Sequence, residues 1–237
     1  MTPELQLLLI TAASIGFIHT LIGPDHYLPF IVMAKAGKWT FRKTMLVTVL
    51  CGIGHVAGSV ILGFIGIAAG IVLTRLEFIE GFRGDIAIWV LIAFGLVYMV
   101  WGLRRAWHNK SHTHKHIHED GTIHTHDHTH YEGHAHVHEN EKQKSITPWV
   151  LFIIFVLGPC EPLIPLLMYP AAMQSTTGIW AVSLVFAAAT IGTMTTIVAF
   201  AYAGLKPIRT VFLEKYVHAI AGFTLLVSGL AMQFLGL

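Results

Sequence analysis

Long apolar runs alternate along the chain with short connections in which the charged residues gather. Six of the runs are about twenty residues or longer, the length that crosses a hydrocarbon core of about 30 Å. The pattern predicts an all-α integral membrane protein with six transmembrane helices. The predicted spans are Leu5–Ala34, Met45–Leu73, Ile86–Trp107, Ile146–Met173, Gly178–Gly204 and Val211–Leu237.

Composition supports the same prediction. Charged residues make up 12% of the chain and apolar residues 54%, whereas a soluble domain averages about 25% charged residues. A soluble domain and a classical enzyme are therefore not expected, and neither is a nucleic-acid partner. The first run follows no basic segment and precedes no small-residue cleavage site, so we expect a retained span and not a signal peptide. The two cysteines, Cys51 and Cys160, lie inside apolar runs and predict no disulfide framework.

The first and fourth spans are interrupted at equivalent places. Gly23-Pro24 breaks the first, and Gly158-Pro159 breaks the fourth. Three spans in each half mean that the halves enter the membrane from opposite faces, as in the inverted repeats of many transporters. We therefore expect a 3+3 inverted repeat in which the first helix of each half is broken. The expected parts are a first repeat over residues 1–107, a His-rich loop over 108–145 and a second repeat over 146–237.

Basic residues separate sharply between the two sides of the membrane. Thirteen lysines and arginines fall in the connections after the first, third and fifth spans, and only Arg75 and Arg83 fall on the other side. The positive-inside rule then predicts an inner-membrane protein with both termini outside and the His-rich loop in the cytoplasm.

Ionisable residues inside the spans are the candidate site. In the first span His19, Asp25 and His26 flank the break, and in the second span His55 follows Gly54. Such residues are costly in lipid, so they face the protein interior, pair with each other or line a wet cavity. Imidazole ligands suit nickel, cobalt, zinc and copper. The alternative is structural: Asp25 caps the helix after the break, and the histidines hydrogen-bond to neighbouring helices.

The second break contributes Cys160 and Glu161, which occupy the positions equivalent to Asp25 and His26. A carboxylate here could complete a metal site or take up a proton when the metal leaves. The alternative is a purely structural break, which explains the prolines but not the glutamate.

The third connection holds twelve of the sixteen histidines. Their alternation suits one face of a strand, with a turn at Asp120-Gly121, but we favour a segment that stays disordered until metal binds. We expect low-affinity metal binding there. The candidate ligands are His112, His114, His116, His118, His124, His126, His128, His130, His134, His136 and His138.

With these motifs the chain resembles the nickel/cobalt transporter superfamily, in particular its six-span NicO- and UreH-like branch. That branch is similar to the sulfite-exporter-like and lysine-exporter-like families. The resemblance lies in the segment from His19 to His26 and in Gly54-His55, although five residues separate His19 from Asp25 where the nickel permeases have four. It implies transport of nickel or cobalt by alternating access at a midplane site of His26, Asp25, His19, His55, Glu161 and Cys160. The metal, with Zn²⁺ as a further candidate, would be cargo and not a permanent cofactor, and a cytoplasmic metallochaperone is a candidate partner.

Two other functions are open. Gly158-Pro159-Cys160 is similar to the Pro-Cys motif of CcdA/DsbD-type membrane thiol-redox carriers, which carry a second cysteine in the first span, where this chain has Asp25. Export of a small sulfur or organic anion is the third candidate. The direction of transport is left open.

Overall fold

The computed structural model describes residues 2–108, 112–117, 123–128, 147–205 and 211–235. Its helices are α1 (Pro3–Ile22), α2 (Leu28–Ala36), α3 (Phe41–Ala68), α4 (Leu73–His108), α5 (Thr147–Leu157), α6 (Leu163–Ala172), α7 (Thr176–Leu205) and α8 (Val211–Leu235). A 3-10 turn, η1 (Pro24–His26), joins α1 to α2. Two strands, β1 (His112–Ile117) and β2 (Ile123–His128), lie between α4 and α5 in the chain.

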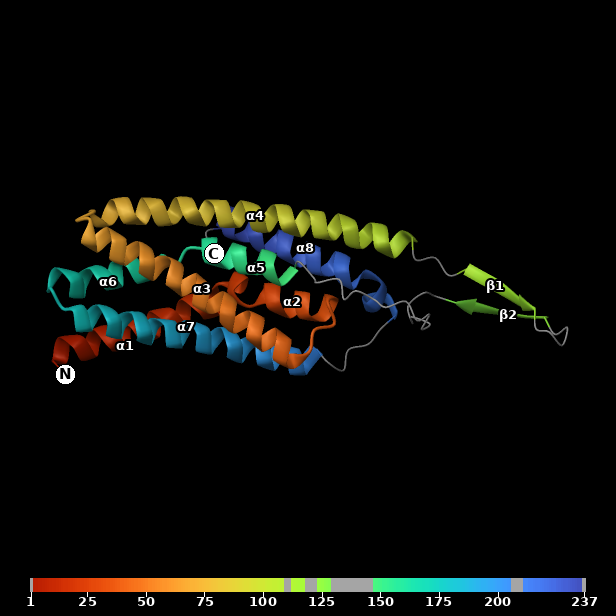
Figure 1. The fold of residues 1–237 in the computed structure, drawn as a ribbon, viewed down its shortest axis with the longest axis horizontal. Helices are drawn as coiled ribbons and strands as arrows, with labels where there is room; N and C mark the ends of the chain where they lie inside the picture. The colour runs from red at the N-terminus through yellow and green to blue at the C-terminus, as the bar shows by residue number, and fades with distance from the viewer. Residues whose placement is uncertain (1, 109–111, 118–122, 129–146, 206–210, 236–237) are drawn as a thin grey trace.

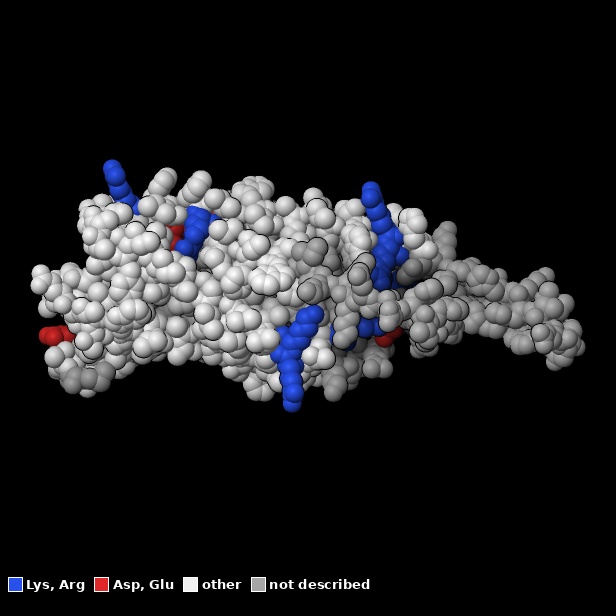
Figure 2. Space-filling model, viewed as in Figure 1, with Lys and Arg blue, Asp and Glu red and all other residues white. Residues whose placement is uncertain are grey.

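The body of the molecule is a bundle of elongated helices (Figure 1). Five of them, α1, α3, α4, α7 and α8, are long and apolar enough to cross a membrane, and α5 and α6 are shorter apolar helices. Large apolar side chains point outward along these helices, as a lipid environment requires, and charged side chains are few on the face drawn in Figure 2. The chain is therefore a multi-pass membrane protein.

Both predicted breaks are present. After α1 the chain becomes extended at Gly23 (φ −79°, ψ 99°) because Pro24 has no N–H with which to continue the helix. After α5 the N–H of Gly158 still bonds to the carbonyl of Ile154 at 2.8 Å. Helical structure then resumes only at Leu163, where α6 begins.

The third span differs from its prediction. The helix α4 begins at Leu73 and not at Ile86, so Arg83 lies inside a helix and not in a connection. The physical reason is a buried face that continues toward the N-terminal end of the helix. Leu76, Glu80 and Gly84 are buried at intervals of four residues, which is the spacing of one helical face.

Close helix contacts hold the bundle together. The most extensive runs between α4 and α8. A Cβ atom added at Gly102 of α4 would lie 2.4 Å from the backbone nitrogen of Ala219 in α8. Backbone approach of this kind requires glycine and is typical of packing between membrane helices. The helix α1 packs on α7, and α3 packs on both α5 and α7.

The strands β1 and β2 form an antiparallel pair, where we had favoured a segment without structure. Their backbone register places histidine opposite histidine three times: His112 with His128, His114 with His126, and His116 with His124. The expected turn at Asp120-Gly121 and the candidates His118, His130, His134, His136 and His138 lie outside the described residues.

Candidate functional site: two breaks in the membrane helices

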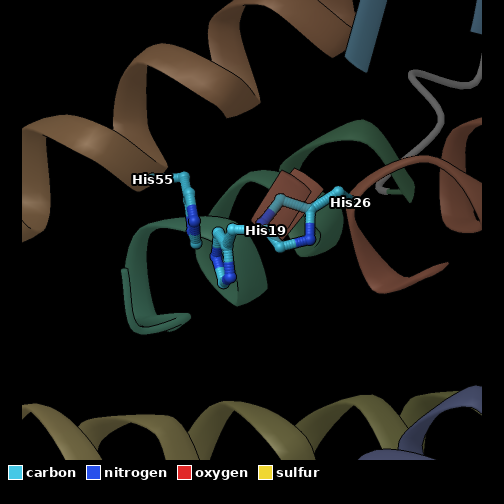
Figure 3. Close-up of side chains that lie close together, drawn as sticks. All are labelled: His19, His26 and His55. Carbon is cyan, nitrogen blue, oxygen red and sulfur yellow. The ribbon is translucent and has the colours of Figure 1, made fainter. Parts of the chain in front are cut away.

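The first break gathers three histidines from three elements. His19 comes from the last turn of α1, His26 from η1 and His55 from the middle of α3. The ring centres of His19 and His26 are 4.7 Å apart, and those of His26 and His55 are 5.1 Å apart. One ring nitrogen from each lies within 4.8 Å of the other two. Figure 3 shows the three rings grouped together; we call them the histidine cluster.

Hydrogen bonds orient two of these rings. Nδ1 of His26 lies 3.2 Å from the carbonyl oxygen of Gly23 and 3.1 Å from Oδ1 of Asp25. Nδ1 of His55 lies 3.3 Å from the carbonyl oxygen of Phe155 in α5. Because a carbonyl oxygen can only accept, both Nδ1 atoms donate, which leaves Nε2 as the acceptor in each neutral ring.

One ring nitrogen of each histidine has no partner within the described residues. Nε2 of His19, His26 and His55 are all buried without a hydrogen bond. The side chains of His26 and His55 are only 2% and 3% exposed. A buried polar atom normally has a partner, and leaving one unpaired costs about 1–3 kcal/mol. Three such atoms at one place therefore indicate a binding site.

Gly23 allows the cluster to form. A Cβ atom at this position would lie 2.7 Å from both Oδ1 of Asp25 and Nδ1 of His26. The glycine therefore leaves the room in which Asp25 and His26 meet. A small pocket of about 30 Å³ adjoins the cluster, and Asp25 and His55 line it together with apolar residues of α4, α5 and α8.

The second break carries an ionic network. Nη2 of Arg83 lies 2.8 Å from Oε1 of Glu80 and 2.7 Å from Oγ of Ser59, and it donates to the carbonyl oxygen of Gly158 at 3.2 Å. The hydroxyl of Ser59 donates to the same Glu80 oxygen. The Glu80 side chain is 1% exposed and that of Arg83 18%.

This network fixes the backbone of Cys160. The N–H of Cys160 bonds to Oε1 of Glu80 at 2.9 Å and to Oγ of Ser59 at 3.1 Å. The Cys160 side chain is fully buried, and its thiol is free. The broken segment thus holds a buried thiol next to a buried ion pair.

Sequence reasoning did not single out Ser59, Glu80 or Arg83. The signal was present, because Ser59 follows His55 by four residues and Glu80 precedes Arg83 by three. Both spacings put side chains on one helical face. The predicted start of the third span at Ile86 hid the pair, because it placed both residues in a connection.

The predicted site residues separate into two groups. Asp25, His19, His26 and His55 meet at the first break. Cys160 belongs to the second break, and Glu161 is exposed there and is not a member of the histidine cluster. The two cysteines also lie apart. Cys51 precedes Ser59, the partner of Cys160, by eight residues, or about 12 Å along α3.

Comparison with known families decides the relationship. Residues 28–231 match the family described as cytochrome c biogenesis protein transmembrane region. The chain belongs to this family. No curated protein and no solved structure matches the chain. The match includes Cys51, His55, Glu80 and Cys160 and begins after His26.

Membership of this family corrects the resemblance drawn from the sequence. The chain does not belong to the nickel/cobalt transporter superfamily, and the prediction of nickel or cobalt transport is wrong. The resemblance depended on a few residues between His19 and His55, whereas the family match spans most of the chain. Of the functions considered, the thiol-redox carrier, given as the alternative, is the one that the match favours.

Proposed function

We propose that this protein carries thiol reducing equivalents across the membrane, as a CcdA/DsbD-like carrier of its family, and that Cys160 is its principal redox thiol. The observation that carries the proposal is a free, fully buried cysteine at a helix break inside the family match. The protein acts in this proposal as a carrier and not as a classical enzyme.

Cys51 is the second thiol of the proposed carrier. Both cysteines are free and buried, and the helix that bears Cys51 packs on α5 and α6, the two helices that flank Cys160. In the oxidised carrier the two sulfurs form a disulfide. A dithiol protein on one side reduces it: the partner's two thiols become a disulfide, and two electrons and two protons pass to Cys51 and Cys160. A disulfide protein on the other side then takes them up by the reverse exchange.

The described conformation corresponds to the reduced carrier. A disulfide needs Cβ atoms about 3.5–4.5 Å apart. Cys51 lies about 12 Å along α3 from Ser59, the residue whose hydroxyl accepts from the N–H of Cys160. Oxidation therefore requires α3 to shift against the broken segment. Gly54 and Gly58 of α3 face Phe152 and Val156 of α5. The surface of α3 that must move is therefore made of small residues, which leave few side-chain atoms in the way of the shift.

Topology and orientation belong to the same proposal. We infer six spans in a 3+3 inverted repeat over residues 1–107 and 146–237, with the His-rich loop 108–145 between them. The two interrupted segments, α1–η1–α2 and α5–α6, support it as the broken first spans of each half. The excess of thirteen basic residues over two supports an inner-membrane location with the loop cytoplasmic and both termini outside.

Reductant transfer in proteoliposomes tests the function. The vesicles contain a disulfide-bonded reporter protein, and a reduced dithiol protein is added outside. We expect wild-type protein to reduce the reporter and both Cys160→Ser and Cys51→Ser to abolish the transfer. Ser183→Ala, which removes a buried hydroxyl bonded only within its own helix, is the matched control and keeps the wild-type rate. Equal rates for wild type and Cys160→Ser would contradict the proposal.

A further inference from the structure

We propose that His19, His26 and His55 form a resident site for one transition-metal ion, with Cu⁺ as the ion that fits best. The ion would be a bound component of the protein and not a transported cargo. The inference is independent of the thiol-carrier function, because it depends on a different break and on different residues.

The donor atoms support a metal site. Three Nε2 atoms are buried without a hydrogen bond, and they belong to rings whose centres are about 5 Å apart. In the neutral rings of His26 and His55 the lone pair is on Nε2, because Nδ1 donates to a carbonyl oxygen. Metal–nitrogen bonds of about 2.0–2.1 Å would bring three ligand nitrogens to roughly 3.5 Å from one another. One nitrogen of each ring now lies within 4.8 Å of the other two, so the ring nitrogens would have to approach one another by at most about an ångström.

The outer hydrogen bonds have the pattern of metal-ligating histidines. Such a histidine almost always donates its second ring N–H to a carboxylate or to a backbone carbonyl, which fixes the ring. His26 has both kinds of partner, Asp25 and the carbonyl of Gly23, and His55 has the carbonyl of Phe155. The three ligands also come from three separate segments, so an ion would join α1, η1 and α3.

Charge favours a monovalent ion. Within the described residues, the partly buried Asp25 is the carboxylate that contacts the cluster, and the buried carboxylate of Glu80 is already paired with Arg83. Cu⁺ and the Asp25 carboxylate cancel, whereas a divalent ion leaves a net charge of +1 inside the membrane, which is costly. Zn²⁺ also takes four ligands in structural sites, and the cluster offers three.

Family membership does not account for the cluster. His19, Asp25 and His26 precede residue 28, where the family match begins. The site is therefore an inference from the geometry of this chain.

Metal binding by purified protein tests the site. The His-rich loop would mask it, so all twelve histidines from His108 to His138 are replaced by asparagine in the full-length chain, which carries no affinity histidines. Cu⁺ is then titrated anaerobically against a chromogenic chelator. We expect one tightly bound Cu⁺ per chain, with three nitrogen ligands in the X-ray absorption spectrum. His19→Ala, in the same background, should weaken binding at least about 100-fold.

His218→Ala is the matched control. His218 is a partly buried histidine of α8, and its Nδ1 already has a partner in the hydroxyl of Tyr98 at 2.8 Å. This variant should bind Cu⁺ like the parent. His19→Gln, which keeps most of the side-chain volume, guards against misfolding and should lose binding as His19→Ala does. Equal Cu⁺ affinity in the parent and in a folded His19 variant would overturn the site, and preference for Zn²⁺ with four ligands would overturn the choice of ion.

Discussion

The two helix breaks use the same backbone device and surround it with opposite chemistry. At the first break, Gly23 and Pro24 interrupt the helix, and three imidazoles gather whose Nε2 atoms have no partner among the described residues. At the second, Gly158 and Pro159 interrupt the helix, and the ion pair of Glu80 and Arg83 donates to and accepts from the released backbone.

This difference suggests that the second break contributes mainly to stability and the first break mainly to ligand binding. At the second break the released backbone groups are paired, because Arg83 donates to the carbonyl of Gly158 and Glu80 accepts from the N–H of Cys160. The two atoms there that lack a partner among the described residues, Oε2 of Glu80 and Nε of Arg83, belong to the ion pair itself. Changes there should act first on the free energy of unfolding. The first break keeps unsatisfied acceptors, so changes there should act first on ligand affinity. The predictions below test this division, from the largest expected effect to the smallest.

Replacement of Arg83 by glutamine should have the largest effect. Glu80 is 1% exposed, and without its partner it becomes a buried unpaired charge, which costs about 3–5 kcal/mol. The measurement is the free energy of unfolding in detergent micelles. Arg75→Gln, at an exposed position of the same helix, should leave stability close to wild type.

A double variant makes that prediction specific. Glu80→Gln combined with Arg83→Gln removes both charges together, so it should recover most of the stability lost in Arg83→Gln. If Arg83→Gln unfolds like wild type, or if the double variant loses the sum of both single effects, the ion pair does not stabilise the second break.

How far the sequence predicts these breaks can be judged from particular residues. Gly23-Pro24 and Gly158-Pro159 were readable because a missing N–H interrupts any helix. The meeting of His55 with His19 and His26 could also be predicted, because imidazoles are costly in lipid and are therefore expected to face one another between neighbouring spans. The Glu80–Arg83 pair was missed because the predicted span began only after these charged residues, where the apolar run starts. The helix α4 begins earlier, because one of its faces is buried on that side of the run as well.

The family relationship was mistaken for a related reason. Histidines and carboxylates in a span are conspicuous, and they drew the sequence interpretation toward metal transport. The family match depends on the pattern of residues 28–231, which no short motif represents. Which atoms pair across helices, such as the N–H of Cys160 with Ser59, depends on the register of α3 against α5, and a sequence pattern does not contain that register.

Asp25→Asn tests the charge at the first break. Asparagine can still accept from Nδ1 of His26, so the ring keeps its orientation while the negative charge is lost. We expect Cu⁺ affinity to fall about 10–100-fold, the usual effect of losing an outer partner of a metal ligand, with little change in unfolding free energy. The loop-substituted protein and the chelator competition described above provide the measurement. Unchanged affinity would show that Asp25 does not balance the charge of the ion.

Ser59→Ala should have a smaller effect, on stability. The hydroxyl contacts Glu80, Arg83 and the N–H of Cys160, but those groups remain bonded to one another without it. The expected loss is about 1 kcal/mol of unfolding free energy. Thr20→Val at the other break removes a buried hydroxyl bonded only to the carbonyl of Gly16 in its own helix, and should cost less. A larger loss of unfolding free energy in Thr20→Val than in Ser59→Ala would show that Ser59 does not stabilise the second break.

The two break glycines give the finest comparison. Neither has a positive φ, so alanine is allowed by the backbone at both, and only the surrounding atoms differ. In Gly23→Ala the new methyl group lies 2.7 Å from Asp25 and His26 and must push them apart. In Gly158→Ala the nearest atoms, Nδ1 of His55 among them, are at 3.4 Å, an ordinary contact that moves nothing. Because side-chain ends can move, we expect Gly23→Ala to weaken Cu⁺ binding by about three- to tenfold through the displaced outer hydrogen bond. Gly158→Ala should leave Cu⁺ binding unchanged. Equal affinities in the two variants would mean that the meeting of Asp25 with His26 does not hold the cluster ready for its ion.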